Sequence, residues 1–138
     1  MSENIESNTT YDKVDFLQSN KNQPGVEVLE NGLQYKIEKE GSGVQPNAND
    51  EVTVMYEGKL INGKVFDSSY ERNQPATFRL DQVIKGWQVA LQKMTEGSIW
   101  TLYIPADLAY GERGIAGVIP PNSVLIFKVE LQKVRPNN

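Results

Sequence analysis

The sequence contains neither cysteine nor histidine among its 138 residues. Without cysteine there is no disulfide, no thiolate nucleophile and no iron–sulfur cluster. Without histidine there is no Ser-His-Asp triad, no imidazole base that titrates near neutral pH, and none of the common zinc sites. Any enzymatic chemistry must then use carboxylates, hydroxyls, backbone amides and apolar surface. We therefore expect no metal and no cofactor, and reactions that break no covalent bond are favoured.

Blocks of basic residues and long apolar runs are also absent. The net charge is −4, with 14 basic against 18 acidic residues, which disfavours nucleic acid and anionic membranes as partners. No apolar run approaches the length of a membrane span, and the first residues lack the basic and apolar regions of a secretory signal. We expect a cytoplasmic protein, although a periplasmic or exported chain cut from a longer precursor would look the same.

The first 25 residues differ in character from the rest and are interpreted as an N-terminal extension. The first ten are polar, and we expect them to be disordered. Tyr11, Val14 and Leu17 stand at helical spacing, and this helix should end before the stretch Asn20–Pro24. So short a helix must pack on something or fray. We expect a monomer with a loosely docked appendage; a dimer contact through this segment is the alternative.

Residues 26–138 form one predicted domain, long enough to bury a core and dominated by alternating apolar and polar positions. Asn62-Gly63, between Leu60 and Val65, is a strong signal for a two-residue hairpin. Alternation recurs over residues 33–37, 52–56, 65–68, 76–80, 100–104 and 124–134. These stretches predict an α+β fold in which a curved antiparallel sheet closes over a helix.

One short helix is expected after residue 83. Trp87, Ala90, Leu91 and Met94 stand at i, i+3, i+4 and i+7 and form one apolar stripe, and Gly97 is a plausible stop. Trp87 lies in the first turn, at the edge of this stripe. Its indole is either an ordinary core side chain or the floor of a pocket, and the spacing alone leaves both readings open.

A long connection, residues 105–122, joins the last two predicted strands. In a compact domain such a connection is usually functional or disordered. This one is too apolar for a solvated linker, because it contains Leu108, Tyr110, Ile115, Val118 and Ile119. It either covers one end of the core or forms a flap whose apolar side chains hang over a pocket.

Four motifs in this order closely resemble those of the FKBP-type peptidyl-prolyl cis–trans isomerases: Val65-Phe66-Asp67-Ser68-Ser69, Val83-Ile84-Lys85-Gly86-Trp87, Ala109-Tyr110-Gly111 and Val118-Ile119-Pro120-Pro121. The resemblance runs from about Gly32 to Val134, and the lead-in from Pro24 to Tyr35 is similar to the bacterial Mip-like branch. It implies a strongly bent antiparallel β-sheet of about five strands wrapped around one short α-helix, with an apolar cleft between them. It also implies isomerisation of X–Pro bonds.

The resemblance further implies a role for each site residue. Trp87 forms the floor of the cleft, Ile84 offers its backbone N–H to a substrate carbonyl, and Tyr110 and Asp67 supply polar contacts at the rim. Arg72 pairs with the Asp67 carboxylate. The remaining substrate-binding residues are expected along the walls and in the flap: Tyr56, Phe66, Phe78, Val83, Ile115, Ile119 and Phe127. Without the resemblance, the apolar members could be plain core, and Asp67 a turn residue bonded to the Ser69 backbone.

Some positions depart from the best-known small members of that family. Ala76 stands where a wall aromatic is often found, so we expect a wider pocket on that side. Leu108 and Ile115-Ala116 replace bulkier groups in the flap. Proline-containing peptides and unfolded polypeptides are the expected partners, and binding of tacrolimus- or rapamycin-type macrolides is left open. The alternative function is a chaperone-like module that holds proline-containing partners without turnover.

Overall fold

The computed structural model describes residues 10–29 and 31–137, with side chains described from Asp15 onward. The expected disordered tail at the N-terminus falls largely outside this range. The described part of the chain begins with α1 (Thr10–Asn20), so the helix predicted around Tyr11 and Leu17 is present. Further along, α2 (Ser69–Arg72), η1 (Leu80–Gln82), α3 (Lys85–Leu91) and η2 (Ala106–Leu108) are all short. No helix in the described part of the chain combines the length and apolarity needed to cross a membrane.

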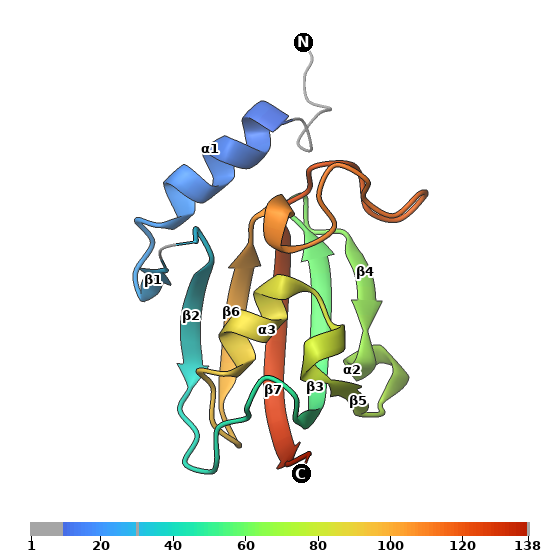
Figure 1. The fold of residues 1–138 in the computed structure, drawn as a ribbon. Helices are drawn as coiled ribbons and strands as arrows, with labels where there is room; N and C mark the ends of the chain where they lie inside the picture. The colour runs from blue at the N-terminus through green and yellow to red at the C-terminus, as the bar shows by residue number, and fades with distance from the viewer. Residues whose placement is uncertain (1–9, 30, 138) are drawn as a thin grey trace.

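Seven strands among the described residues form one antiparallel sheet, which confirms the predicted fold class (Figure 1). They are β1 (Val26–Val28), β2 (Gln34–Lys39), β3 (Glu51–Leu60), β4 (Val65–Ser68), β5 (Ala76–Arg79), β6 (Ile99–Ile104) and β7 (Leu125–Arg135). The order is β1-β2-β6-β7-β3-β4, and β5 also pairs with β3. The expected count of about five strands is too low. Strand β1 is too short to show an alternation pattern, and β4 and β5 pair with successive stretches of β3.

The long strands β3 and β7 form the centre of the sheet, paired from Glu51↔Arg135 to Leu60↔Leu125. A hairpin is present between β3 and β4 at the predicted Asn62-Gly63, but its loop is longer than the two residues expected, because residues 61–64 separate the strands. Gly63 has a φ of 90° and donates its N–H to the Leu60 carbonyl at 2.9 Å. Such a positive φ is the conformation that favours glycine at this turn.

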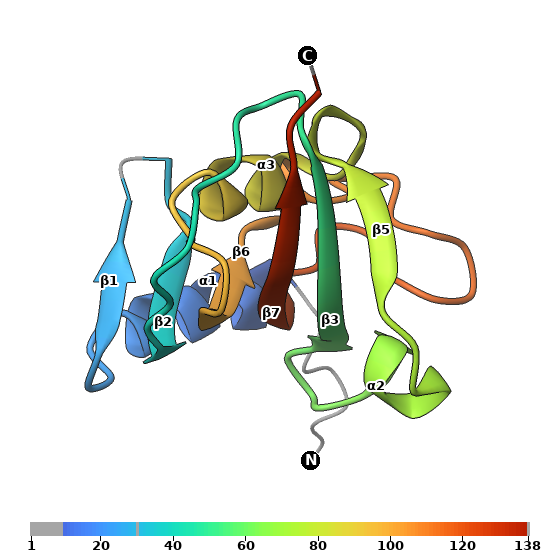
Figure 2. The same cartoon turned by 90° about the horizontal axis from the view of Figure 1, so that it is seen from below.

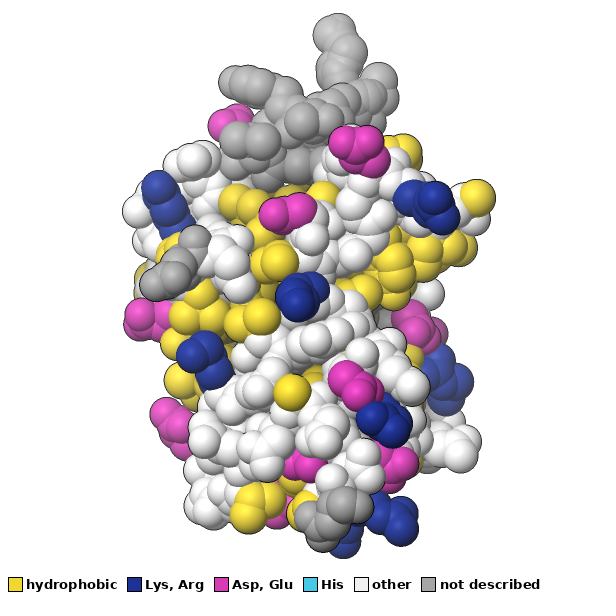
Figure 3. Space-filling view, viewed as in Figure 1, with side chains coloured by type: hydrophobic (Ala, Val, Ile, Leu, Met, Phe, Trp, Pro, Cys, Tyr) yellow, Lys and Arg dark blue, Asp and Glu magenta, His cyan; other side chains and the backbone are white. Residues whose placement is uncertain are grey.

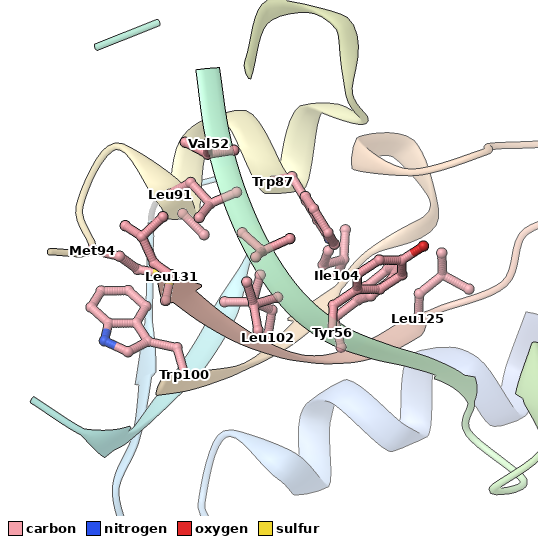
Figure 4. Close-up of a cluster of buried hydrophobic side chains, with 14 of the residues drawn as sticks. Val52, Tyr56, Trp87, Leu91, Met94, Trp100, Leu102, Ile104, Leu125 and Leu131 are labelled. Carbon is pink, nitrogen blue, oxygen red and sulfur yellow. The ribbon is translucent and has the colours of Figure 1, made fainter. Parts of the chain in front are cut away.

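Helix α3 lies against the concave face of the sheet (Figures 1 and 2). Trp87, Ala90 and Leu91 are buried as predicted, and Met94 is fully buried as well. However, the helix ends at Leu91, three residues before the predicted stripe ends. The N–H groups of Lys93 and Met94 bond back over three residues, so Met94 enters the core from a turn. Figure 4 shows the core between α3 and the central strands.

Helix α1 lies on the opposite side of the sheet from α3 (Figure 2). Its Phe16 ring packs against Tyr103 of β6, with ring centroids 6.2 Å apart. Asn20 donates from its side chain to the Gln34 side chain at 2.8 Å, and Gln34 donates to the Leu17 carbonyl at 3.0 Å. Asn20 and Gln34 are both buried. The contact is therefore more specific than the loose docking expected from the sequence.

Candidate active site

A cavity of about 440 Å³ opens beside the first turn of α3. Its lining comes from β3, β4, β5, β7, the segment before α3, α3 itself and the 105–122 loop: Tyr56, Phe66, Asp67, Phe78, Gln82, Val83, Ile84, Trp87, Tyr110 and Phe127. Sites for small molecules typically enclose roughly 300–1,000 Å³. Figure 3 shows apolar side chains on the projecting 105–122 loop and on the surface beside it. The sheet and the helix thus bring nine of the twelve predicted site residues together.

Trp87 is buried yet lines this cavity, with only 4% of its surface exposed. Three aromatic rings meet the indole edge to face: Tyr56 at 5.3 Å, Phe78 at 5.6 Å and Phe127 at 5.3 Å between centroids. Such edge contacts are a favoured geometry for aromatic pairs and hold the ring in place. The indole Nε1–H is buried and has no hydrogen-bond partner among the described residues. An unpaired buried donor is uncommon in a folded protein.

The segment Val83-Ile84 is held by the helix that follows it. Gln88 donates from its side chain to the Val83 carbonyl at 2.8 Å. The Ile84 carbonyl accepts the N–H groups of Trp87 and Gln88, at 3.0 and 3.1 Å, and so begins α3. Within the described part of the chain, no group accepts a hydrogen bond from the Ile84 N–H. Ile84 lines the cavity, so its N–H is our candidate donor to an external acceptor.

Three side chains at the edge of the cavity form a closed hydrogen-bonded network. The Tyr56 hydroxyl donates to Asp67 Oδ2 at 2.5 Å, and Arg72 donates to Asp67 Oδ1 at 2.7 Å and to the Tyr56 oxygen at 3.2 Å. The buried Ser69 hydroxyl accepts the Tyr56 backbone N–H at 2.8 Å. The Asp67 carboxylate thus bonds side chains, and the turn role considered from the sequence does not describe it.

The network fixes the protonation states of its members. Burial alone would raise the pKa of Asp67, but the hydrogen bonds from Tyr56 and Arg72 outweigh it and hold this pKa below its ordinary value. Burial, together with the bond to Asp67, raises the pKa of Tyr56. Asp67 is therefore an anion, and Tyr56 a neutral phenol, at physiological pH.

Tyr110 reaches the cavity from the 105–122 loop. Burial and the nearby charge of Asp67 raise the pKa of its phenol, so the hydroxyl keeps its proton and can donate. Its backbone carbonyl accepts the Gly114 N–H at 3.0 Å, and the Gly111 N–H bonds the Ala106 carbonyl at 2.8 Å. These bonds hold Tyr110 at the base of a compact flap.

Three predicted residues lie outside the cavity lining. Arg72 contacts it only through Asp67 and Tyr56. Ile119 is buried in the core, and its backbone pairs with Ile115 in a two-bond bridge at 2.8 Å each way. Ile115 is 39% exposed on the flap. The 105–122 loop therefore has both roles considered from its sequence: Tyr110 faces the cavity, while Ile119 covers the core.

Two residues of the site were not predicted from the sequence. Gln82 lines the cavity, and its only signal was its position directly before Val83-Ile84. Ser69 belongs to a recognised motif, but no pattern indicates that its hydroxyl bonds the Tyr56 backbone. Ala76, where a wider wall was expected, is absent from the cavity lining, and Phe78 on the same strand lines it instead. Within the described residues, no three acidic side chains gather to form a candidate metal site.

Comparison with known proteins gives two family models. Residues 42–132 match the model "FKBP-type peptidyl-prolyl cis-trans isomerase", and residues 2–37 match "Domain amino terminal to FKBP-type peptidyl-prolyl isomerase". The chain is 63% identical over 120 residues to the peptidyl-prolyl cis-trans isomerase Mip of Coxiella burnetii, and 53% identical over 120 residues to the outer membrane protein MIP of Legionella longbeachae. Each match covers 87% of this chain but 52% of the relative, so the chain spans about half the length of these proteins.

Two solved structures share the fold. FkpA from Escherichia coli superposes with a TM-score of 0.88 at 42% identity, covering 91% of this chain and 59% of that one. A peptidyl-prolyl cis-trans isomerase from Pseudomonas syringae pv. tomato superposes with a TM-score of 0.88 at 40% identity, covering 99% of both chains.

Proposed function

The chain belongs to the FKBP-type peptidyl-prolyl cis–trans isomerase family, and on that premise we propose that it rotates X–Pro bonds in peptides and folding proteins. One observation carries the proposal: an apolar cavity with Trp87 in its lining, edged by the free Ile84 N–H and the Asp67 network. This arrangement suits a neutral, planar imide that has to lose its water and twist. The residues that line the cavity include no serine, cysteine, lysine or histidine.

The barrier to rotation comes from resonance. A peptide bond resists rotation by ~18–20 kcal/mol, and X–Pro isomers exchange over tens to hundreds of seconds. The planar imide is the more charge-separated state, while the twisted transition state has lost that resonance. Transfer from water into the aromatic cavity should therefore disfavour the planar state relative to the twisted one.

The polar groups at the edge would orient the substrate. The Ile84 N–H and the Tyr110 hydroxyl can each bond a carbonyl that flanks the proline, so that rotation occurs about the intended bond. Raising a rate of roughly 0.01 per second to ~10³ per second requires about 7 kcal/mol from the barrier. In this proposal, desolvation, orientation and selective binding of the twisted imide together lower the barrier by that amount. No proton is transferred, and no covalent bond is formed or broken.

A protease-coupled assay tests the activity. A protease that cleaves only trans X–Pro tetrapeptides leaves a slow phase that reports isomerisation of the remaining cis fraction. We expect this phase to accelerate in proportion to the concentration of the protein. An unchanged slow phase, with binding of the same peptide still detectable, would support the alternative of a binding module without turnover.

The same cavity is also our candidate for binding tacrolimus- or rapamycin-type macrolides. Its volume and aromatic lining support this, as does the exposed apolar surface of Ile115 and Val118 on the adjacent flap. Titration followed by Trp fluorescence tests the proposal, since Trp87 lies in the cavity. Competition by a proline peptide is the expected control, because both ligands would use one site.

Oligomeric state and location remain proposals. We propose a monomer, supported by α1 covering part of its own sheet through Phe16, Asn20 and Gln34; a dimer through residues 1–25 is the alternative. Sedimentation of the whole chain against one that starts at Val26 tests this, and a larger assembly for the whole chain alone would favour the dimer.

A cytoplasmic location is likewise proposed from the sequence, and cell fractionation tests it.

A further inference from the structure

Gly58 is the one inward-facing position of β3 that carries no side chain. Burial alternates along this strand, and Gly58 falls on the buried face. The other residues on that face are apolar: Val52, Val54, Tyr56 and Leu60. Gly58 pairs with Asp67 on β4 and with Phe127 on β7, so it lies directly behind the wall of the cavity.

The backbone does not require glycine here. The φ of Gly58 lies outside the left-handed region, and glycine in a strand interior weakens the strand. Space is what excludes a side chain. A Cβ at this position would lie 2.6 Å from Cε1 of Phe127 and 2.7 Å from Cζ of Phe66, whereas real Cβ contacts essentially never fall below 3.0 Å.

A group at Gly58 would press the two rings away from β3. Phe127 already meets Trp87 at 5.3 Å and Phe66 at 5.7 Å, in both cases edge to face. Phe127 is thus packed against two other rings, and β3 lies beside the strands that carry Phe66 and Phe127. Both rings line the cavity, so a group added at Gly58 would push their edges into it.

We propose that Gly58 is a specificity-determining residue of the isomerase site. Because it has no side chain, the Phe66 and Phe127 rings sink toward β3, and the depth they reach sets how large a side chain next to proline the cavity accepts. This inference rests on the proposed function, and it extends that function to a residue that contacts no substrate itself.

The test compares two substrates that differ only before proline, one with alanine and one with phenylalanine. In the Gly58→Ala variant, kcat/KM for the phenylalanine peptide should fall relative to the alanine peptide by roughly tenfold, the discrimination that one methylene group gives in an apolar pocket. Leu131→Val is the matched control. Leu131 is fully buried near Met94 and Trp100, away from Tyr56 (Figure 4), so its variant should lose stability but keep the wild-type ratio.

A second variant covers a failure of Gly58→Ala to fold. Phe66→Leu removes one of the two ring edges that the new methyl group meets, so the double variant Gly58→Ala/Phe66→Leu has less overlap and should fold. Phe127 still has to yield toward the cavity in this variant, so the ratio of kcat/KM values should stay below that of Phe66→Leu alone. An unchanged ratio in a folded Gly58→Ala variant overturns the proposal. If Gly58→Ala does not fold, the proposal is overturned by a double variant whose ratio of kcat/KM values equals that of Phe66→Leu. It is also overturned by a double variant that fails to fold.

The wild-type protein separates this inference from the proposed function. If it isomerises neither peptide, the proposed function fails. The two peptides are then compared by their Kd values in place of kcat/KM. A lower relative affinity of Gly58→Ala for the phenylalanine peptide would still support the role of Gly58. Absence of any peptide binding by the wild type would overturn both.

Discussion

The hydroxyl of Tyr56 donates to the Asp67 carboxylate at 2.5 Å, joining the central strand β3 to β4 at the edge of the cavity. Arg72 closes the network by bonding both partners. The carboxylate is thus oriented from two sides and kept ionised, although the Asp67 side chain is 40% exposed. The network positions a fixed negative charge beside a neutral, aromatic surface.

Removing the Tyr56 hydroxyl and the Asp67 carboxylate should give non-additive effects, because each group is the partner of the other. In a double-mutant cycle of Tyr56→Phe and Asp67→Ala, we expect a coupling of about 1 kcal/mol in the free energy of unfolding, reduced from the value of a buried charged hydrogen bond by the exposure of Asp67. Urea denaturation of the four proteins measures it. Additive effects would show that the bond contributes nothing in solution.

The isomerase rate should be independent of pH between about 5 and 9. The pKa of Asp67 is lowered in the fold, so its stabilising contribution is present above the unfolded pKa and is lost only as pH falls through the folded value. The pKa values of Tyr56 and Tyr110 are raised, so both phenols stay neutral up to and beyond their ordinary pKa of 10.0. A bell-shaped profile of kcat/KM centred near neutral pH would contradict this account.

The flap should respond differently to substitution at two of its glycines. Gly114 and Gly117 have φ values of 60° and 77°, so alanine is strained at both, by about 1–2 kcal/mol. A Cβ at Gly114 would also collide with the Ile119 carbonyl, while nothing lies within 4 Å of one at Gly117.

Gly114→Ala should therefore destabilise the protein by about 1–3 kcal/mol more than Gly117→Ala, the usual cost of overpacking. The Gly114→Ala substitution should also raise KM, because the Gly114 N–H bonds the carbonyl of Tyr110 at the base of the flap. Thermal unfolding and peptide kinetics measure the two effects. Equal behaviour of the two variants would mean that the Ile115–Ile119 bridge can open without consequence.

Docking of α1 should depend on Asn20. Its side chain donates to the buried Gln34, and Asn20→Ala would leave the Gln34 oxygen unpaired, at a cost of about 1–3 kcal/mol. The control is Asn22→Ala, since Asn22 is exposed and its side chain makes a single 3.4 Å bond, to the Gln18 carbonyl; we expect a change within about 0.5 kcal/mol. Chemical denaturation compares the two. Equal effects would show that α1 does not pack on the sheet in solution.

The fold was predictable wherever residue patterns are local. Alternation located the longer strands, and Asn62-Gly63 located a hairpin, because side-chain period and turn chemistry depend on neighbouring residues. Strand β1 was missed because three residues carry no period. The end of α3 was misplaced because Met94 keeps its apolar character whether it enters the core from a helix or from a turn.

The site was predictable only in part, because it gathers residues that are distant in the sequence. The resemblance of four motifs identified most of the cavity lining, including Trp87 and Asp67. It also placed Ile119 on the wall, whereas this side chain is buried in the core and absent from the cavity lining. The space behind Phe66 that Gly58 provides is a property of three strands together, and no single-chain pattern reports it.

Exchange NMR of a proline peptide at equilibrium tests the central claim most directly, since it measures the cis–trans rate without a protease. With substoichiometric wild-type protein, cross-peaks between the cis and trans resonances should appear within about a second, against tens to hundreds of seconds without catalysis. They should weaken strongly with Trp87→Leu, which removes the indole from the cavity. Peptide resonances that shift on binding but show no cross-peaks would contradict the account, because the cavity would then bind proline without rotating its bond.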